Sequence, residues 1–171
     1  MNGKTKKTLK WILVALILAG VIGTLIWWAK KAESNLPGEA VPIQPAEHIN
    51  PSDPLPGLYL TNPPVSGWHY SQPAEWGIYD KEMPDQTLIH NLEHGGIWIS
   101  YKPDAPQELI DNLKKLAGEY KRKVILTPRA ANDSLIALVA WGRLDKFDYW
   151  DEARIKKFIK AFKDKGPEFV P

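Results

Sequence analysis

The sequence contains no cysteine among its 171 residues. This excludes disulfide bonds, thiolate zinc sites, iron–sulfur clusters and cysteine nucleophiles. Any metal site must therefore be built from nitrogen and oxygen donors, with sulfur supplied only by methionine. The absence does not place the chain in the cytoplasm, because a domain of more than about a hundred residues buries enough core to be stable without disulfides.

The chain also has little net charge, +2 from 22 basic and 20 acidic residues. Six lysines surround a single apolar run, and they are Lys4, Lys6, Lys7, Lys10, Lys30 and Lys31. Without them, 16 basic residues face 20 acidic ones, so the remainder is mildly acidic. A mildly acidic domain repels polyanions, so we expect no nucleic-acid partner.

The apolar run is WILVALILAGVIGTLIWW, residues 11–28, and it carries no charge. As a helix rising about 1.5 Å per residue, it comes close to the hydrocarbon thickness of a bilayer. We predict a single transmembrane helix over residues 11–29, through which the chain contacts the lipid bilayer. More lysines precede the run than follow it, which favours an orientation with residues 1–10 in the cytoplasm and the rest outside the cell membrane.

A cleaved signal peptide is the alternative interpretation of this run. Its apolar region would be shorter and would end at a cleavage site with small residues. Here Trp27, Trp28, Lys30 and Lys31 occupy that place. The sequence therefore favours an uncleaved anchor.

Proline is concentrated in one region, with ten of the 15 prolines between residues 33 and 84. Each proline removes a backbone donor, so long helices and central strands are not expected there. We predict a Pro-rich spacer over residues 30–46, followed by an extracytoplasmic domain over residues 47–171. Residues 47–86 contain too many tyrosines and tryptophans for a disordered linker, and are expected to form an ordered loop.

The rest of the chain alternates strand and helix patterns. The expected elements are a strand at 97–101, a helix capped by Asp104, strands at 123–127 and 135–142, and a helix capped by Asp148. This order, β-α-β-β-α, predicts an α+β fold: a compact two-layer domain in which a small sheet carries two helices on one face. The long Pro-rich loop segment and the N-terminal transmembrane helix precede it.

All four histidines fall between positions 48 and 94: His48, His69, His90 and His94. They come from three separate segments, and His90 and His94 lie on one side of a helical turn. Gly95 and Gly96 then mark a sharp turn into a strand. Converging imidazoles are typical of a transition-metal site, so we predict one formed by the four histidines with Glu93. Copper or zinc suits these donors, and metal handling or sensing is the function we expect.

A metal-dependent hydrolase of cell-envelope substrates is one alternative. Residues 90–94 fit the HxxEH pattern of inverted zinc peptidases, in which the Glu polarises a water. Glu93 would then be the catalytic residue, and Glu168 is available by count as a downstream ligand. The pattern requires a long helix, whereas Gly95, Gly96 and a strand follow at once, so this alternative is the weaker one.

A second alternative is a protein or glycan interaction module without metal. Trp68 and Trp76 would provide its aromatic platform, although Trp76 fits better as the apolar underside of the loop. Met83 is a soft ligand that would favour copper, but methionine more often serves for packing.

Several motifs give the chain a resemblance to a known family. They are PPVSGWH ending at His69, WGIY at 76–79, HNLEHGGIWISY at 90–101 and AWGRLDKFD at 140–148. With these motifs the chain resembles the domain of unknown function (DUF) 3105 family, found mostly in bacterial membrane-anchored or exported proteins, over roughly residues 47–168. The recurring motifs of that family match His48, His69, His90, Glu93 and His94. Val65 departs from the Thr more usual there, and the resemblance brings no established activity.

Overall fold

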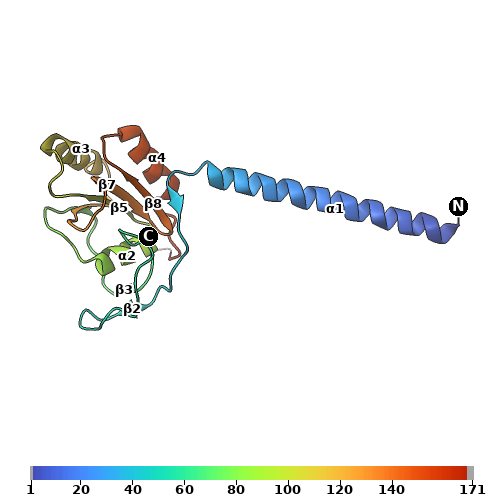
Figure 1. Ribbon diagram of the computed structural model, residues 1–171, viewed down its shortest axis with the longest axis horizontal. Coiled ribbons are helices and arrows are strands. Elements are labelled where there is room, and N and C mark those ends of the chain that lie inside the picture. The colour runs from blue at the N-terminus through green and yellow to red at the C-terminus, as the bar shows by residue number, and fades with distance from the viewer. Residues whose placement is uncertain (1, 169–171) are drawn as a thin grey trace. The chain divides into compact units, whose positions relative to one another are not determined.

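The computed structural model describes residues 2–168 and divides into two compact units with the boundary between Leu36 and Pro37. The first unit is a single helix, α1 (Gly3–Ser34), shown in blue in Figure 1. Within its Leu9–Ser34 portion, an 18-residue window has a mean hydropathy of 2.4 and no buried residues. By length and composition this helix is suited to cross a membrane, and a signal sequence has the same properties.

The second unit is built on a six-stranded mixed sheet. In spatial order its strands are β1 (Glu39–Ala40), β8 (Arg143–Phe147), β7 (Ile136–Ala140), β5 (Ile97–Tyr101), β6 (Val124–Pro128) and β4 (Gly77–Ile78). The β5–β6 and β4–β6 pairs are parallel and the other pairs are antiparallel. A separate parallel pair joins β2 (His48–Ile49) to β3 (His69–Tyr70).

Helices cover both faces of the large sheet, which explains why β5, β6 and β7 are buried along their whole length. On one face, Leu88 and Leu92 of α2 (Asp85–Glu93) pack in one cluster with Trp98. Residues next to Trp98 on β5 point the other way. Figure 1 shows α3 (Gln107–Ala117) and α4 (Glu152–Phe162) on that opposite side.

The mixed α and β class is therefore confirmed, but the two-layer prediction is incomplete. The predicted order β-α-β-β-α omits α2, which adds a third layer, and β8. The strand at 97–101 is confirmed residue for residue, and the strand expected at 123–127 lies at Val124–Pro128. The strand expected over 135–142 ends at Ala140, because Gly142, with φ +69°, turns the chain into β8.

Both predicted helix caps are wrong. Helix α4 is capped by Asp151, whose side chain accepts a hydrogen bond from the Arg154 amide at 2.9 Å. Asp148 instead accepts a hydrogen bond from the Leu135 amide at 2.7 Å, just before β7. Helix α3 follows Pro106 and has no side-chain cap, so Asp104 does not serve as one.

Part of the expected spacer over residues 30–46 packs within the second unit. Residues Glu39–Ala40 pair with β8 as β1. The Val41 amide donates to the Gly142 carbonyl at 3.0 Å, and its side chain packs against the core cluster. The Gln44 amide donates to the hydroxyl of Ser66 at 3.0 Å. The last of these bonds holds the segment against the residues that lead into His69 of β3.

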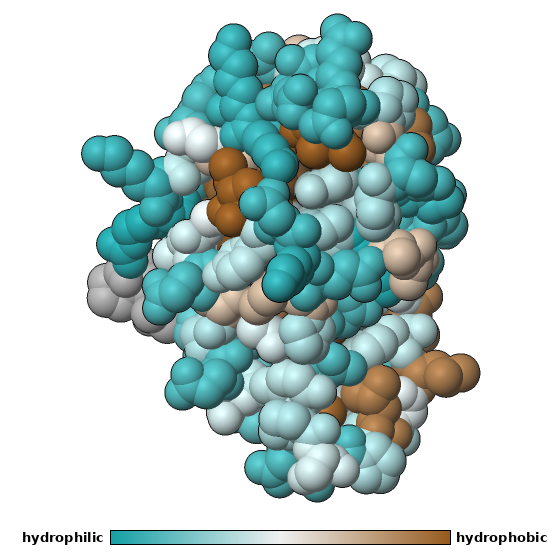
Figure 2. Space-filling view, turned by 90° about the vertical axis from the view of Figure 1, so that its left-hand side faces the viewer, coloured by the Kyte–Doolittle hydropathy of each residue, from teal (hydrophilic) through white to brown (hydrophobic). Residues whose placement is uncertain are grey.

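The surface of the second unit is mostly polar on the side turned to the viewer in Figure 2, where hydrophobic residues show in separate spots. The large hydrophobic side chains exposed on this unit are Ile43, Leu55, Leu58, Leu60, Ile78 and Tyr149. Scattered exposed apolar residues of this kind are normal for a globular surface. The core therefore accounts for the stability of the unit.

We expect Leu92→Ala to lower the free energy of unfolding of this unit by about 2–5 kcal/mol, because Leu92 is fully buried between α2 and the sheet and its removal leaves a cavity. The matched control is Leu60→Ala, at an exposed position, which should change it by less than about 0.5 kcal/mol. Urea denaturation of the full chain in detergent measures both. Equal effects would contradict the position assigned to α2.

Candidate metal centre

Helix α2 delivers two of the predicted ligands from its last turn. Pro84 precedes the helix and Asp85 lies in its first turn, where a carboxylate stabilises the helix dipole. Its apolar residues face the sheet, which leaves His90 and Glu93 on the side toward β3. The helix ends at Glu93 because Gly95 has φ +75°, a conformation that glycine adopts without strain.

The short parallel pair β2–β3 delivers the other two histidines. His48 lies directly opposite His69 in the register, and the His69 amide donates to the Glu47 carbonyl at 3.0 Å. Opposed residues of paired strands point to the same face. Because β3 also packs against α2, the imidazoles of both strands reach the last turn of that helix.

The structure brings four of the five predicted residues into one group. The donor atoms of His48, His69, His90 and Glu93 all lie within 4.8 Å of one another. The ring of His48 is 4.8 Å from that of His69 and 5.2 Å from that of His90, centroid to centroid. His48 is exposed and the other three residues are buried, so the group lies at the edge of the unit with one ligand open to solvent.

Backbone carbonyls fix the orientation of the two buried rings. Nδ1 of His69 lies 2.8 Å from the Gly67 carbonyl, and Nδ1 of His90 lies 2.7 Å from the Tyr70 carbonyl. A carbonyl oxygen only accepts, so each Nδ1 carries the hydrogen and donates. In the neutral rings, Nε2 is then left with a lone pair directed into the group, which is how ligating histidines are usually held.

Burial favours the neutral, ligating form of His90. Its pKa is lowered, first by desolvation and further by the neighbouring imidazoles of His94, His69 and His48, while the Tyr70 carbonyl acts in the opposite direction. The burial effect prevails. Nε2 of His90 therefore has a lone pair available for a metal ion.

The contact between His69 and Glu93 needs a positive charge. Nε2 of His69 lies 2.9 Å from Oε2 of Glu93, although Nδ1 already holds the hydrogen of a neutral ring. If the imidazole is neutral and the carboxylate ionised, Nε2 of His69 and Oε2 of Glu93 are both acceptors and no hydrogen lies between them. Either a proton or a cation bound by both groups removes this conflict.

His94, the fifth predicted residue, lies beside the group and not within it. Its Nε2 is 3.1 Å from Nε2 of His90 and 3.2 Å from Oε2 of Glu168. Because Nε2 of His90 can only accept, the hydrogen between the two rings belongs to His94. His94 thus extends the cluster toward the C-terminal end of the described chain.

Glu168, named in the sequence analysis only as a downstream ligand available by count, lies beside His94. The segment before it crosses the end of α2: the Asp164 amide donates to the Gly95 carbonyl at 2.8 Å and the Glu168 amide to the Glu93 carbonyl at 3.1 Å. The crossing needs glycine at 166, since a Cβ there would lie 2.0 Å from the Glu93 carbonyl oxygen. Nothing local in the sequence signals this contact.

Two polar residues that sequence reasoning also missed support the group. Asn91 binds the backbone of Ala74 on both sides, accepting from its amide and donating to its carbonyl at 2.8 Å each. Lys123 donates to the His94 carbonyl at 2.6 Å, and burial lowers the pKa of its ammonium. These bonds fix the loop before β4 and the end of α2.

The other candidates have structural roles. Met83 packs against the core cluster, so its observed role is packing and not that of a soft ligand. Trp76 packs on the same cluster and on Gly96, where a Cβ would meet its ring at 2.6 Å. Trp68 lies against Gly57. The interpretation of Trp76 as the apolar underside of the loop is the one that fits.

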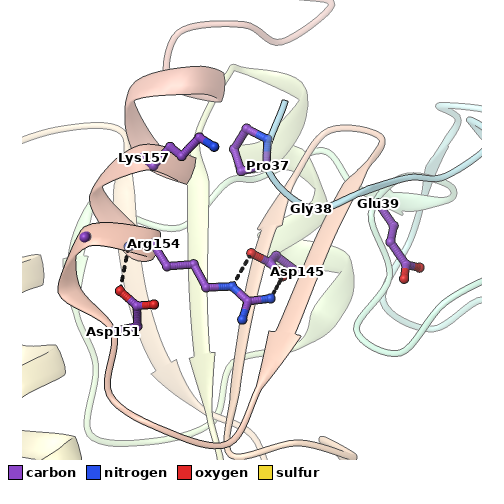
Figure 3. A pocket seen from close by; sticks show the side chains of 8 residues that line it. Pro37, Gly38, Glu39, Asp145, Asp151, Arg154 and Lys157 are labelled. Atoms are coloured by element: carbon purple, nitrogen blue, oxygen red, sulfur yellow. Dashed lines mark hydrogen bonds and ion pairs between the residues drawn. The ribbon is translucent and has the colours of Figure 1, made fainter. Parts of the chain in front are cut away.

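A hollow of about 560 Å³ in the second unit lies between residues 37–39, β8 and α4, and no member of the histidine group lines it. Figure 3 shows Arg154 extended across it to Asp145, with nitrogen–oxygen distances of 2.5 and 2.9 Å. This pair compensates the buried carboxylate of β8. A smaller hollow of about 270 Å³ has His94 on its wall and lies beside the candidate site.

Tyr59 anchors the chain on which His69 lies, and its hydroxyl donates to the Trp68 carbonyl at 2.7 Å. Burial raises the pKa of Tyr59 to about 12. Because the folded-state pKa lies above the unfolded value, the contribution of this bond to stability is complete below about pH 10 and is lost as the pH rises toward 12.

We expect Tyr59→Phe to have a lower melting temperature than the wild type at pH 8, and the difference to shrink by pH 11. A constant difference would contradict this assignment.

Comparisons with known proteins add a family but no function. No curated protein and no solved structure matches the chain. A sequence model of one family matches residues 56–170, a range that includes His69, His90, Glu93 and His94 and begins after His48. The chain therefore belongs to the family described as protein of unknown function (DUF3105).

Proposed function

We propose that the chain is a membrane-anchored protein whose extracytoplasmic unit binds one transition metal ion, copper or zinc, in order to handle or sense it. The observation that carries this proposal is the convergence of four donor atoms within 4.8 Å from three distant segments. Three imidazoles and a carboxylate form a ligand set that suits either metal. His48, His69, His90 and Glu93 are the proposed ligands, with His94 adjoining His90.

The hydrogen bonds around the group support a cation in its centre. Two rings have Nδ1 committed to backbone carbonyls, and one of them opposes a carboxylate oxygen at 2.9 Å. A bound metal ion would turn this opposition into two coordination bonds. It would also remove the cost of burying the Glu93 carboxylate beside neutral imidazoles.

The proposed location follows from α1 and from the lysines around it. We propose that residues 1–10 are a cytoplasmic tail, that residues 11–29 span the bilayer and that the part beyond residue 46 is the extracytoplasmic domain, connected by residues 30–46. The excess of lysines before the span favours this orientation. The acidic balance of the domain gives no support to a nucleic-acid partner.

Binding is better supported than hydrolysis. A hydrolase of the HxxEH type uses its Glu to activate water at an open position of the metal. Here Glu93 is buried against His69, and α2 ends at Glu93 so that His94 lies past the helix. Glu93 is therefore better placed as a ligand than as a base.

Metal content tests the proposal directly. The full chain, purified in detergent and dialysed against Zn²⁺ or Cu²⁺, should retain about one ion per molecule, and Glu93→Gln should weaken binding about tenfold or more because it removes an anionic donor. Glu108→Gln, the same substitution at an exposed position of α3, should bind like the wild type. Absence of bound metal in the wild type would end the proposal.

Removal of the metal should also lower thermal stability. An ion present at a hundred times its dissociation constant adds about 2.7 kcal/mol to the folded state, which corresponds to roughly 5–15 °C in melting temperature. We expect a chelator to lower the melting temperature of the metal-loaded wild type by this amount. In His90→Ala, which lacks a central ligand, the chelator should have no effect; an equal shift in both proteins would show that the ion binds elsewhere.

A further inference from the structure

The donor groups around the candidate centre form a continuous series from the interior to the solvent. Glu93 and His69 lie at the inner end, with side chains 7% and 0% exposed. His90 and His94 follow, with Nε2 atoms 3.1 Å apart. Glu168 is at the outer end, where its side chain is 55% exposed and lies 3.2 Å from His94.

The spacing of the outer donors suits a metal ion. Two ligands about 2.0–2.1 Å from one zinc ion are roughly 3.3 Å apart at a tetrahedral angle. The His90–His94 and His94–Glu168 distances, 3.1 and 3.2 Å, are close to that value. When an ion binds Nε2 of His94, the ring hydrogen lies on Nδ1 instead. The ion then moves inward through His90 by exchanging Glu168 for donors of the inner group.

The position of the smaller hollow points to the same route. Its wall includes His94, and none of His48, His69, His90 and Glu93. An ion that enters there meets His94 before any other imidazole. The same wall has two basic residues, Arg122 and Lys123, and one acidic residue, Glu75, so a further carboxylate beside His94 favours the approach of a cation.

The backbone holds Glu168 in place independently of any ion. Its amide donates to the Glu93 carbonyl, and Asp164 donates to Gly95, so the carboxylate is attached to the same helix end that carries the inner ligands. Gly166 permits this close crossing. The two positions are thus both attached to the end of α2.

We propose that His94 and Glu168, together with His90, form a second, outer metal position through which an ion enters and leaves the inner group. This inference rests on the proposed function, because it assigns the path to that same centre. The outer position binds more weakly than the inner one, since it has fewer donors and lies in contact with water. Nε2 of His90 serves one position at a time, so His94 and Glu168 hold the outer ion when the inner position is occupied.

The test uses the full chain in detergent with Zn²⁺ as the probe and compares Glu168→Gln with the control Glu108→Gln. Equilibrium dialysis at excess Zn²⁺ should give a second, weaker equivalent in the wild type and the control, but only the first in Glu168→Gln. Stopped-flow mixing of the singly loaded protein with a chromogenic chelator should show release slowed about fivefold or more in Glu168→Gln alone. Uptake of Zn²⁺ by the metal-free protein should slow to a similar extent.

Several results would overturn the outer position while leaving the inner one intact. One is a single tight Zn²⁺ equivalent in the wild type, together with Zn²⁺ uptake and release in Glu168→Gln at the wild-type rates. Another is faster Zn²⁺ exchange in Glu168→Gln, which would show that Glu168 covers the site and does not bind the ion. If the C-terminal segment has only a structural role, Glu168→Gln should still bind the second Zn²⁺ equivalent. If the wild type retains no Zn²⁺ at all, the proposed function itself fails.

Discussion

The arrangement of the histidines depends on one constraint: a buried imidazole must satisfy its ring N–H. His69 and His90 both satisfy it with a backbone carbonyl, from Gly67 and Tyr70. Each bond fixes the tautomer and turns the other nitrogen toward a common centre. These carbonyls belong to the segment that forms β3, so the path of residues 67–70 determines where the donors point.

The rest of the unit holds that segment against α2. The β2–β3 pair sets His48 opposite His69, Tyr59 anchors Trp68, and Asn91 ties the following loop to the helix. The helix is in turn packed on the large sheet through Leu88 and Leu92. A long segment with little regular structure is thereby ordered by a few directed hydrogen bonds, which is sufficient where each bond fixes a buried group.

Sequence reasoning succeeded where local pattern decides the structure. The alternation of residues 97–101 gave a strand with the observed bounds, and the apolar stripes gave α3 and α4. The histidines were recognisable as a candidate site because they are few and close in the chain. The structure confirms that three of them gather with Glu93.

Sequence reasoning failed where tertiary contacts override local pattern. Helix α2 is short and follows a Pro-rich region, and its tertiary packing on the sheet stabilises it. Strand β8 contains three charged residues in five, and its buried Asp145 is tolerated because Arg154 of α4 neutralises it. Glu168 reaches His94 only through the fold, as a contact between residues far apart in the chain.

The central claim is that imidazoles of distant segments share one metal ion. X-ray absorption spectroscopy of the metal-loaded full chain counts the donors and identifies imidazole by its outer-shell scattering. We predict a shell of nitrogen and oxygen donors at about 2.0–2.1 Å with the scattering of about three imidazole rings. A shell made of water and carboxylate oxygens alone would contradict the account.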